Sequence, residues 1–158
     1  MTKTDVTENP FLDTNLHNIF ATDESLEEEG AWVTVNDLIG LKIKVRRLRS
    51  DAVIKVFERV VREHYGEEFL RKPEGLSESE SETILKRQLA EGVIVDWKGV
   101  RNNKTGKEIP YSKEAALQMM NMKDFREFVY QAANSRDTFR EKADKKLRET
   151  DQVPSVEP

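Results

Sequence analysis

Few side chains in this sequence have the type and spacing that enzyme chemistry requires. His17 and His64 are its two histidines, and neither stands in a metal-binding frame. Cysteine is absent, which excludes disulfides, thiolate catalysis and cysteine-ligated zinc. Nucleophile-elbow, dinucleotide-binding and Walker sequences are missing, since Gly106-Lys107-Glu108 lacks both the upstream glycine and the following Ser or Thr. We therefore predict a protein that is not an enzyme, with no catalytic residue, metal site or cofactor.

Charge is distributed unevenly along the chain. Residues 1–30 carry eight acidic side chains against Lys3, whereas residues 40–62 carry eight Lys and Arg side chains against two acidic ones. This predicts an acidic arm followed by a basic patch. No apolar run approaches the ~20 residues that a membrane-spanning helix needs, so we expect no membrane as partner.

The basic patch is one candidate binding surface. A surface of this kind suits phosphate groups and would fit a nucleic-acid-binding accessory protein. The candidate phosphate-binding residues are Lys42, Lys44, Arg46, Arg47 and Arg49. We favour the alternative, a solvated face or one covered by the acidic arm, because Trp32 is the one aromatic residue near these charges.

Apolar periodicity indicates the elements that would position any site. Residues 31–35 and 41–45 alternate with period two, and Asn36, Asp37 and Gly40 between them suit a turn, so a hairpin is expected. Helical patterns follow over 51–65, from 78 to near Gly92, over 113–120 and from about 123 to 147, with a break at 134–135. The predicted fold class is mainly α (α+β): an N-terminal β-hairpin, then about four helices, with flexible termini.

The predicted domain organisation has three parts. Residues 1–29 form an acidic, largely flexible arm, 30–149 a hairpin plus helical domain, and 150–158 a disordered tail. Five apolar residues of the arm fall near one helical face, which predicts a short helix that docks or binds a partner. These residues are Phe11, Leu12, Leu16, Ile19 and Phe20. Residues 23–29 are expected to be a solvated linker.

Aromatic and methionine residues supply the remaining candidates for contact with a partner. The candidate partner-binding residues are Trp32, Phe57, Trp97, Tyr111, Met119 and Met120. For Trp97 and Tyr111 a structural role is favoured, in which they anchor the polar loop 101–106 to the core. Met119 and Met120 suit an adaptable surface or, more simply, helix core. On this interpretation the loop joins two helices and does not cradle a ligand.

One stretch of the chain resembles a known family. An apolar run into Asp96-Trp97-Lys98-Gly99-Val100, then Gly106, Ile109-Pro110-Tyr111-Ser112, Glu114, Ala116 and a Leu/Met pair, resembles the tail assembly chaperones of long-tailed bacteriophages. An early Trp-bearing strand, the sequence VRRLRS and a late AANSRDTFRE segment extend the similarity over about residues 30–145. It is a pattern of structural positions and carries over no catalytic residue.

The resemblance implies a non-catalytic chaperone. Such proteins bind the tape measure protein, keep it soluble, help recruit tail-tube subunits, and are typically absent from the finished virion. The partners implied are the tape measure protein and the tail-tube protein in the host cytoplasm, and unfilled apolar grooves would promote self-association. Many members also have a longer form made by ribosomal frameshifting, for which Lys145-Lys146 is a hypothetical site.

Overall fold

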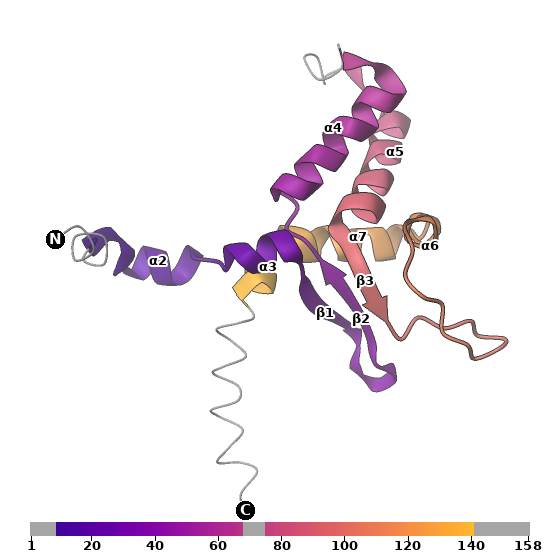
Figure 1. The fold of residues 1–158 in the computed structure, drawn as a ribbon, viewed down its shortest axis with the longest axis horizontal. Helices are drawn as coiled ribbons and strands as arrows, with labels where there is room; N and C mark the ends of the chain where they lie inside the picture. Colours follow the sequence, from indigo (N-terminus) through magenta and orange to yellow (C-terminus); the bar gives the residue numbers. More distant parts are fainter. Residues whose placement is uncertain (1–8, 68–74, 141–158) are drawn as a thin grey trace, which may run out of the picture.

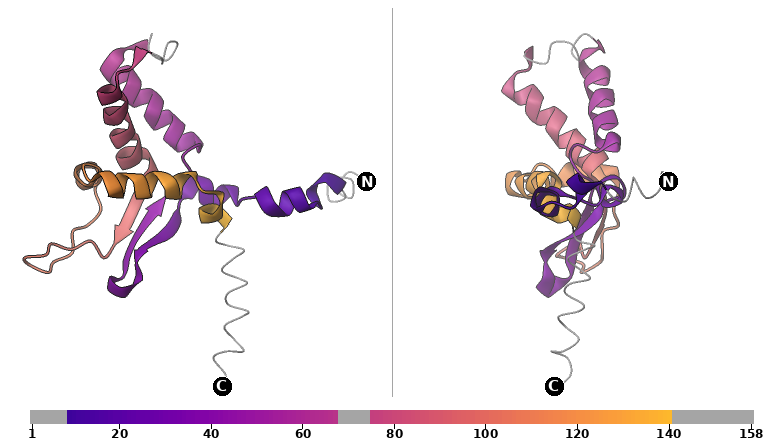
Figure 2. Two further views of the ribbon diagram at one scale, coloured as in Figure 1. Left: turned by 180° about the vertical axis from the view of Figure 1, so that it is seen from behind. Right: turned by 90° about the vertical axis from the view of Figure 1, so that its left-hand side faces the viewer.

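The computed structural model describes residues 9–67 and 75–140. A small sheet lies at its centre, the α4–α5 helix pair projects from one end of the sheet, and α7 lies against one face (Figure 1). An N-terminal arm leaves the body on one side, and a long loop after β3 extends on the opposite side (Figures 1 and 2).

Three short helical segments precede the sheet. They are the 3₁₀ helix Pro10–Leu12 and the α-helices α2 (Asn15–Phe20) and α3 (Glu24–Glu29). Thr14 and Asp23 cap the two α-helices, because their side-chain oxygens accept hydrogen bonds from amides of the first turn. Gly30 ends α3 with a φ of +110°, a conformation that L side chains rarely adopt.

The sheet has three antiparallel strands in the order β1-β2-β3. The strands are β1 (Ala31–Asn36), β2 (Leu41–Val45) and β3 (Ile94–Lys98), and a 3₁₀ turn, Asp37–Ile39, joins the first two. Val33, Ile43 and Trp97 lie in cross-strand register, so they share the face that packs on the core. Trp32 and Lys44 are also paired and lie on the opposite face.

Four α-helices follow the hairpin. They are α4 (Asp51–Tyr65), α5 (Glu78–Gln88), α6 (Lys113–Met119) and α7 (Lys123–Asn134). A π-helical turn, Leu89–Val93, leads from α5 into β3, and a 3₁₀ segment, Arg136–Arg140, follows α7. Ser77 and Glu80 form a capping box at the start of α5, because the side chain of each accepts a hydrogen bond from the amide of the other.

The main core lies between the sheet, the π turn and helices α6 and α7. It contains Ile43, Val93, Trp97, Met120 and Phe139, which are at most 5% exposed. A second, smaller cluster of Val60, Val61 and Ile84 holds α4 against α5.

The predicted fold class is confirmed: the N-terminal hairpin and the four following helices are all present, and β3 adds a third strand. The break at 134–135 is also confirmed, because α7 ends at Asn134. The expected end of a helix near Gly92 is confirmed, because the helical conformation continues from α5 through the π turn and ends at Val93. The domain boundaries after residues 29 and 149 stay predictions, and residues 141–158 lie outside the described part.

The prediction of a solvated linker over 23–29 is right about exposure for Glu24, Ser25, Glu28 and Glu29 but wrong about the linker, because Glu24–Glu29 form α3. Glu27 is buried, and its carboxylate pairs with Arg47 at 3.2 Å and Arg49 at 3.3 Å. The Thr22 hydroxyl donates a third hydrogen bond to the same oxygen at 2.9 Å. Charge pairing between segments distant in the sequence therefore places an acid-rich helix against the body.

Candidate functional site

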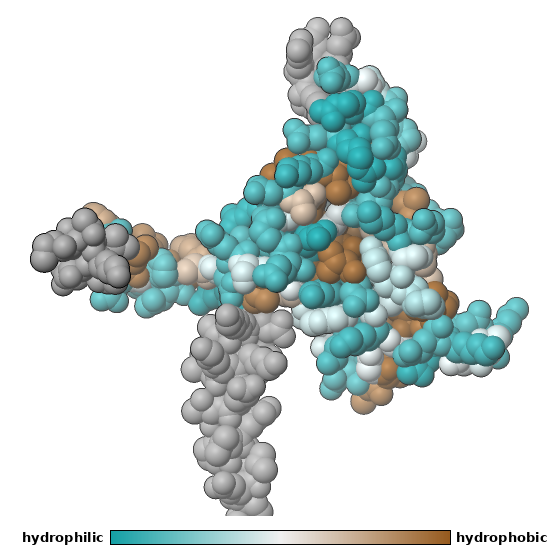
Figure 3. Space-filling view, viewed as in Figure 1, coloured by the Kyte–Doolittle hydropathy of each residue, from teal (hydrophilic) through white to brown (hydrophobic). Residues whose placement is uncertain are grey.

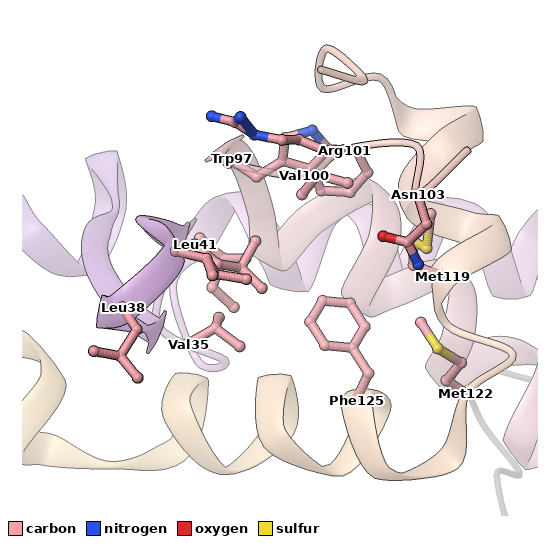
Figure 4. Close-up of a pocket in the computed structure, with 13 residues that line it drawn as sticks. Val35, Leu38, Leu41, Trp97, Val100, Arg101, Asn103, Met119, Met122 and Phe125 are labelled. Carbon is pink, nitrogen blue, oxygen red and sulfur yellow. The ribbon is translucent and has the colours of Figure 1, made fainter. Parts of the chain in front are cut away.

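An apolar groove of about 650 Å³ lies beside the hairpin tip. Three walls enclose it: the β1–β2 hairpin, the end of β3 with the loop that follows, and the α6–α7 junction (Figure 4). The hairpin wall consists of Val35, Leu38, Ile39, Leu41 and Ile43. The other walls consist of Trp97, Gly99, Val100, Arg101, Asn103, Met119, Met122 and Phe125. Arg101 and Asn103 are the polar members of this set.

The hairpin tip presents apolar side chains to solvent. Leu38 is 96% exposed and Ile39 is 59% exposed. Asn36 and Gly40 stabilise the turn. The Asn36 Oδ1 accepts a hydrogen bond from the amide of Leu38 at 3.0 Å, and Gly40 has a φ of +67°. The two large residues between them are therefore not needed by the turn and face outward.

Gly99 brings the second wall against the first. Its φ is +81°, and a Cβ at this position would overlap the carbonyl oxygen of Gly40. Only glycine allows the end of β3 to pass this close to the hairpin tip. The two glycines together determine how near the loop wall lies to Leu38.

The loop of the second wall folds back on itself like a hairpin and is held by hydrogen bonds within it. The Ile109 amide donates to the Val100 carbonyl at 2.7 Å, and Asn102 Oδ1 accepts from the amides of Lys104 and Thr105. The Arg101 guanidinium lies 3.5 Å from the Glu108 carboxylate across this loop. The loop is thus ordered by local contacts and does not need a ligand to shape it.

Trp97 joins this loop to the core. Its indole N–H donates to the Ile109 carbonyl at 2.7 Å, and its ring meets Tyr111 edge-on at 5.4 Å between centroids. The Tyr111 hydroxyl donates to the Ile94 carbonyl at 2.8 Å, and burial raises the pKa of Tyr111. One edge of Trp97 also lines the groove, so this residue is both an anchor and part of the groove wall.

The third wall comes from the short connection between α6 and α7. Met119 is half-buried, Met122 is 52% exposed, and Phe125 projects toward Val100 across the hollow (Figure 4). The Arg126 guanidinium donates to the Met120 carbonyl at 2.7 Å and holds the connection in place. Flexible thioether side chains at such an edge can adapt to differently shaped apolar partners.

Two of the six predicted contact residues line this groove, namely Trp97 and Met119. Tyr111 lies behind Trp97, and Met120 is fully buried, so its assignment as a contact residue is corrected to core. Phe57 packs in the α4–α5 cluster, and Trp32 lies on the opposite sheet face beneath Lys98, whose Nζ is 4.5 Å from the ring centroid. These four residues belong to other parts of the molecule.

The predicted basic patch is divided by the structure. Lys42 and Lys44 lie half-exposed on the open sheet face near Trp32. Arg47 is buried beside Glu27, and burial, then the charge of Arg49, lowers the pKa of Arg47. Arg49 also pairs with Glu27.

Arg46 is engaged as well, because its guanidinium donates to the carbonyls of Glu28 and Gly92. All three arginines therefore hold protein groups. The suggestion that the acidic arm covers part of the patch agrees with these contacts.

Sequence reasoning missed Leu38, Ile39, Val100, Met122 and Phe125 as groove residues. A signal existed for the first two, because two large apolar residues inside a tight polar turn have no folding role there. Within residues 9–67 and 75–140, no group of His, Asp or Glu is arranged to hold a metal ion. No helix in the same ranges is long and apolar enough to cross a membrane.

Comparison with known proteins places the chain in a family. The model of a family described as the YdaY prophage protein matches residues 48–149, which is 102 of the 158 residues. No curated protein and no solved structure gives a significant match. The matched segment contains β3, the loop and α6–α7, and therefore two of the three groove walls. This phage-derived chain belongs to the YdaY prophage protein family.

Proposed function

We propose that the protein is a non-catalytic phage tail assembly chaperone that binds the tape measure protein. It keeps that protein soluble and helps recruit tail-tube subunits in the host cytoplasm, and it is absent from the finished virion. The observation that carries this proposal is the exposed apolar groove whose rim is formed by Leu38, Ile39 and Met122. The prophage family supports the phage context, and the resemblance to tail chaperones supplies the partner.

The groove suits an amphipathic helix laid across it. Its volume of about 650 Å³ lies within the range of pockets that bind apolar groups in proteins, which is about 300–1,000 Å³. A few side chains at i, i+3, i+4 and i+7 of a client helix could enter it while the client backbone stays outside. A tape measure protein before assembly is a long helical chain with such apolar stripes.

The remaining surface is polar, as a helper that keeps another chain in solution requires. Charged residues make up 35% of the sequence, and polar side chains dominate the visible face of α4 and α5 (Figure 3). Apolar groups are visible at the hairpin tip and on the N-terminal arm, and a further apolar patch lies in the middle of the body in the same view. A soluble body with localised apolar binding edges fits a chaperone better than a structural tube protein.

Co-expression with the tape measure protein of the same prophage tests the proposal. The wild-type chain should shift the tape measure protein into the soluble fraction and co-purify with it. Leu38→Asp should abolish both effects, because a charge would have to enter an apolar contact. The matched control is Ile54→Asp, which places the same charge on an exposed apolar residue of α4 outside the groove. Equal loss in both variants, or in neither, would contradict the assignment.

A nucleic-acid-binding function through the basic patch has less support. Lys42, Lys44 and Lys98 share the open sheet face with Trp32, which could stack on a base. Of the three arginines that would strengthen such a surface, Arg47 is buried against α3 and Arg46 is bonded to α3 and the π turn, while the Arg49 side chain is 67% exposed beside Glu27. Binding to generic duplex DNA that falls steeply with salt would favour this second function over the first.

A further inference from the structure

The N-terminal arm presents a second apolar surface, which stays largely exposed among the residues that the structure describes. Phe11 is 80% exposed, Leu16 65% and Phe20 58%, and Leu12 and Ile19 are also largely exposed. The 3₁₀ turn and α2 already hold these residues in helical conformation. The arm therefore resembles the kind of client helix that the groove is shaped to accept.

Contacts with the C-terminal 3₁₀ segment direct the arm away from the body. The Arg140 guanidinium donates to the carbonyls of Asn18 and Ile19, each at 2.6 Å. Arg136 lies 4.9 Å from the centre of the Phe20 ring, and the Asp23 amide donates to the Phe139 carbonyl. The arm consequently leaves the body opposite the loop that walls the groove (Figures 1 and 2). In this arrangement the arm cannot fill the groove of its own chain.

The two surfaces are complementary in charge as well as in polarity. Residues 9–20 contain one acidic side chain, Asp13, and no Lys or Arg. The loop over the groove, residues 99–108, contains Arg101, Lys104 and Lys107 against Glu108. An apolar segment with one negative charge and an apolar groove beneath a loop of net positive charge attract each other weakly at long range and exclude water at contact.

We propose that residues 9–20 of one copy occupy the groove of a second copy when no client is bound. The arm then acts as an internal mimic of the client and protects both apolar surfaces until the client displaces it. The exchange between copies stands on the geometry above, and the displacement step rests on the proposed function. At low protein concentration the arm and the groove should both become exposed.

Disulfide trapping tests the exchange directly, because the chain contains no cysteine. Asn15→Cys lies on α2 and Asn103→Cys lies at the groove edge, and both positions are exposed and outside the apolar contact. Mixing the two full-length variants under mild oxidation should give the mixed disulfide several-fold more often than mixing Asn15→Cys with Glu58→Cys on α4. Equal yields would overturn the proposal, as would rapid intrachain closure in the double variant Asn15→Cys/Asn103→Cys.

A second variant tests whether the trapping reflects groove occupancy. Leu38→Asp in the Asn103→Cys chain should reduce the mixed disulfide to the control yield, whereas Ile54→Asp should leave it unchanged. Sedimentation of the wild-type chain should show a concentration-dependent dimer or larger species that Phe11→Asp dissociates. A monomer at all concentrations would refute the exchange.

Adding the tape measure protein separates this proposal from the proposed function. If the mixed disulfide forms and the client lowers its yield, both are supported. If the client co-purifies but no mixed disulfide forms, the arm exchange is wrong and the chaperone function stands. If the mixed disulfide forms and the client neither lowers it nor co-purifies, the groove belongs to the arm and the proposed function is wrong.

Discussion

Replacing Trp97 with alanine should destabilise the protein strongly. The side chain is 5% exposed, its N–H is bonded to the Ile109 carbonyl, and its ring contacts Tyr111. The substitution removes an anchor that holds β3, the following loop and the start of α6 together. We expect the fold to survive with much of its stability lost.

The magnitude can be estimated from these contacts. A buried tryptophan removes about 150–250 Å² from water, which at about 25 cal/mol per Å² corresponds to about 4–6 kcal/mol. A partly compact unfolded state reduces this value, and the lost indole hydrogen bond adds about 1 kcal/mol. Measured truncations of buried aromatic residues to alanine cost about 3–5 kcal/mol. We therefore expect Trp97→Ala to lower the free energy of unfolding by about 4 kcal/mol. Trp97→Phe should lower it by about 1–2 kcal/mol, because it keeps most of the ring burial.

Urea unfolding followed by circular dichroism measures the effect without relying on tryptophan emission. Trp32→Ala is the control, because Trp32 is half-buried on the open sheet face and should cost about 1 kcal/mol at most. A loss of less than about 1 kcal/mol for Trp97→Ala, at an unchanged denaturant slope, would refute the anchoring role.

Three further predictions concern the groove wall and the ion pairs. Gly99→Ala should lower the free energy of unfolding by about 2 kcal/mol in the same urea experiment, because the positive φ of Gly99 and the nearby Gly40 carbonyl both oppose a Cβ. Gly106→Ala should lower it less, because Gly106 has a positive φ but open space around it. Glu27→Gln should lower the free energy of unfolding by about 3 kcal/mol, because Arg47 would stay buried without its counter-charge. Glu29→Gln on the same helix is the control and should leave the free energy of unfolding nearly unchanged. Burial raises the pKa of Glu91, but the hydrogen bonds and charges of Arg87 and Arg59 outweigh it and lower that pKa below its ordinary value. Stability from Glu91 is therefore present at neutral pH and lost as pH falls below about 4.3, and Glu91→Gln should flatten this acid dependence of the urea midpoint.

The strands and helices were predictable because each has a local signal. Alternation over 31–35 and 41–45 predicted the hairpin, and the helical pattern from residue 78 predicted α5. The π turn had no such signal. It depends on Gly92 lying against α4, where a Cβ would come within 3.2 Å of the Val56 Cβ, and this contact exists only after α4 and α5 pack together.

The site was less predictable because it depends on contacts between distant segments. Phe125 has the periodicity of a core residue, and only the meeting of α7 with the loop after β3 makes it part of a groove. The arginines of the basic patch looked free in the sequence, although Glu27 and the carbonyls of Glu28 and Gly92 engage them. Pairings of this kind join residues 18 to 46 positions apart, for which periodicity gives no signal.

Hydrogen exchange of the chain in complex with its tape measure protein would locate the contact most directly. Binding of the client in the groove should slow exchange at the hairpin tip, residues 36–41, and at residues 99–103, with α4 unchanged. Leu38→Asp should remove this protection together with co-purification. Protection confined to α4 and α5, or to the sheet face that carries Trp32, would contradict the assignment of the groove as the client-binding site.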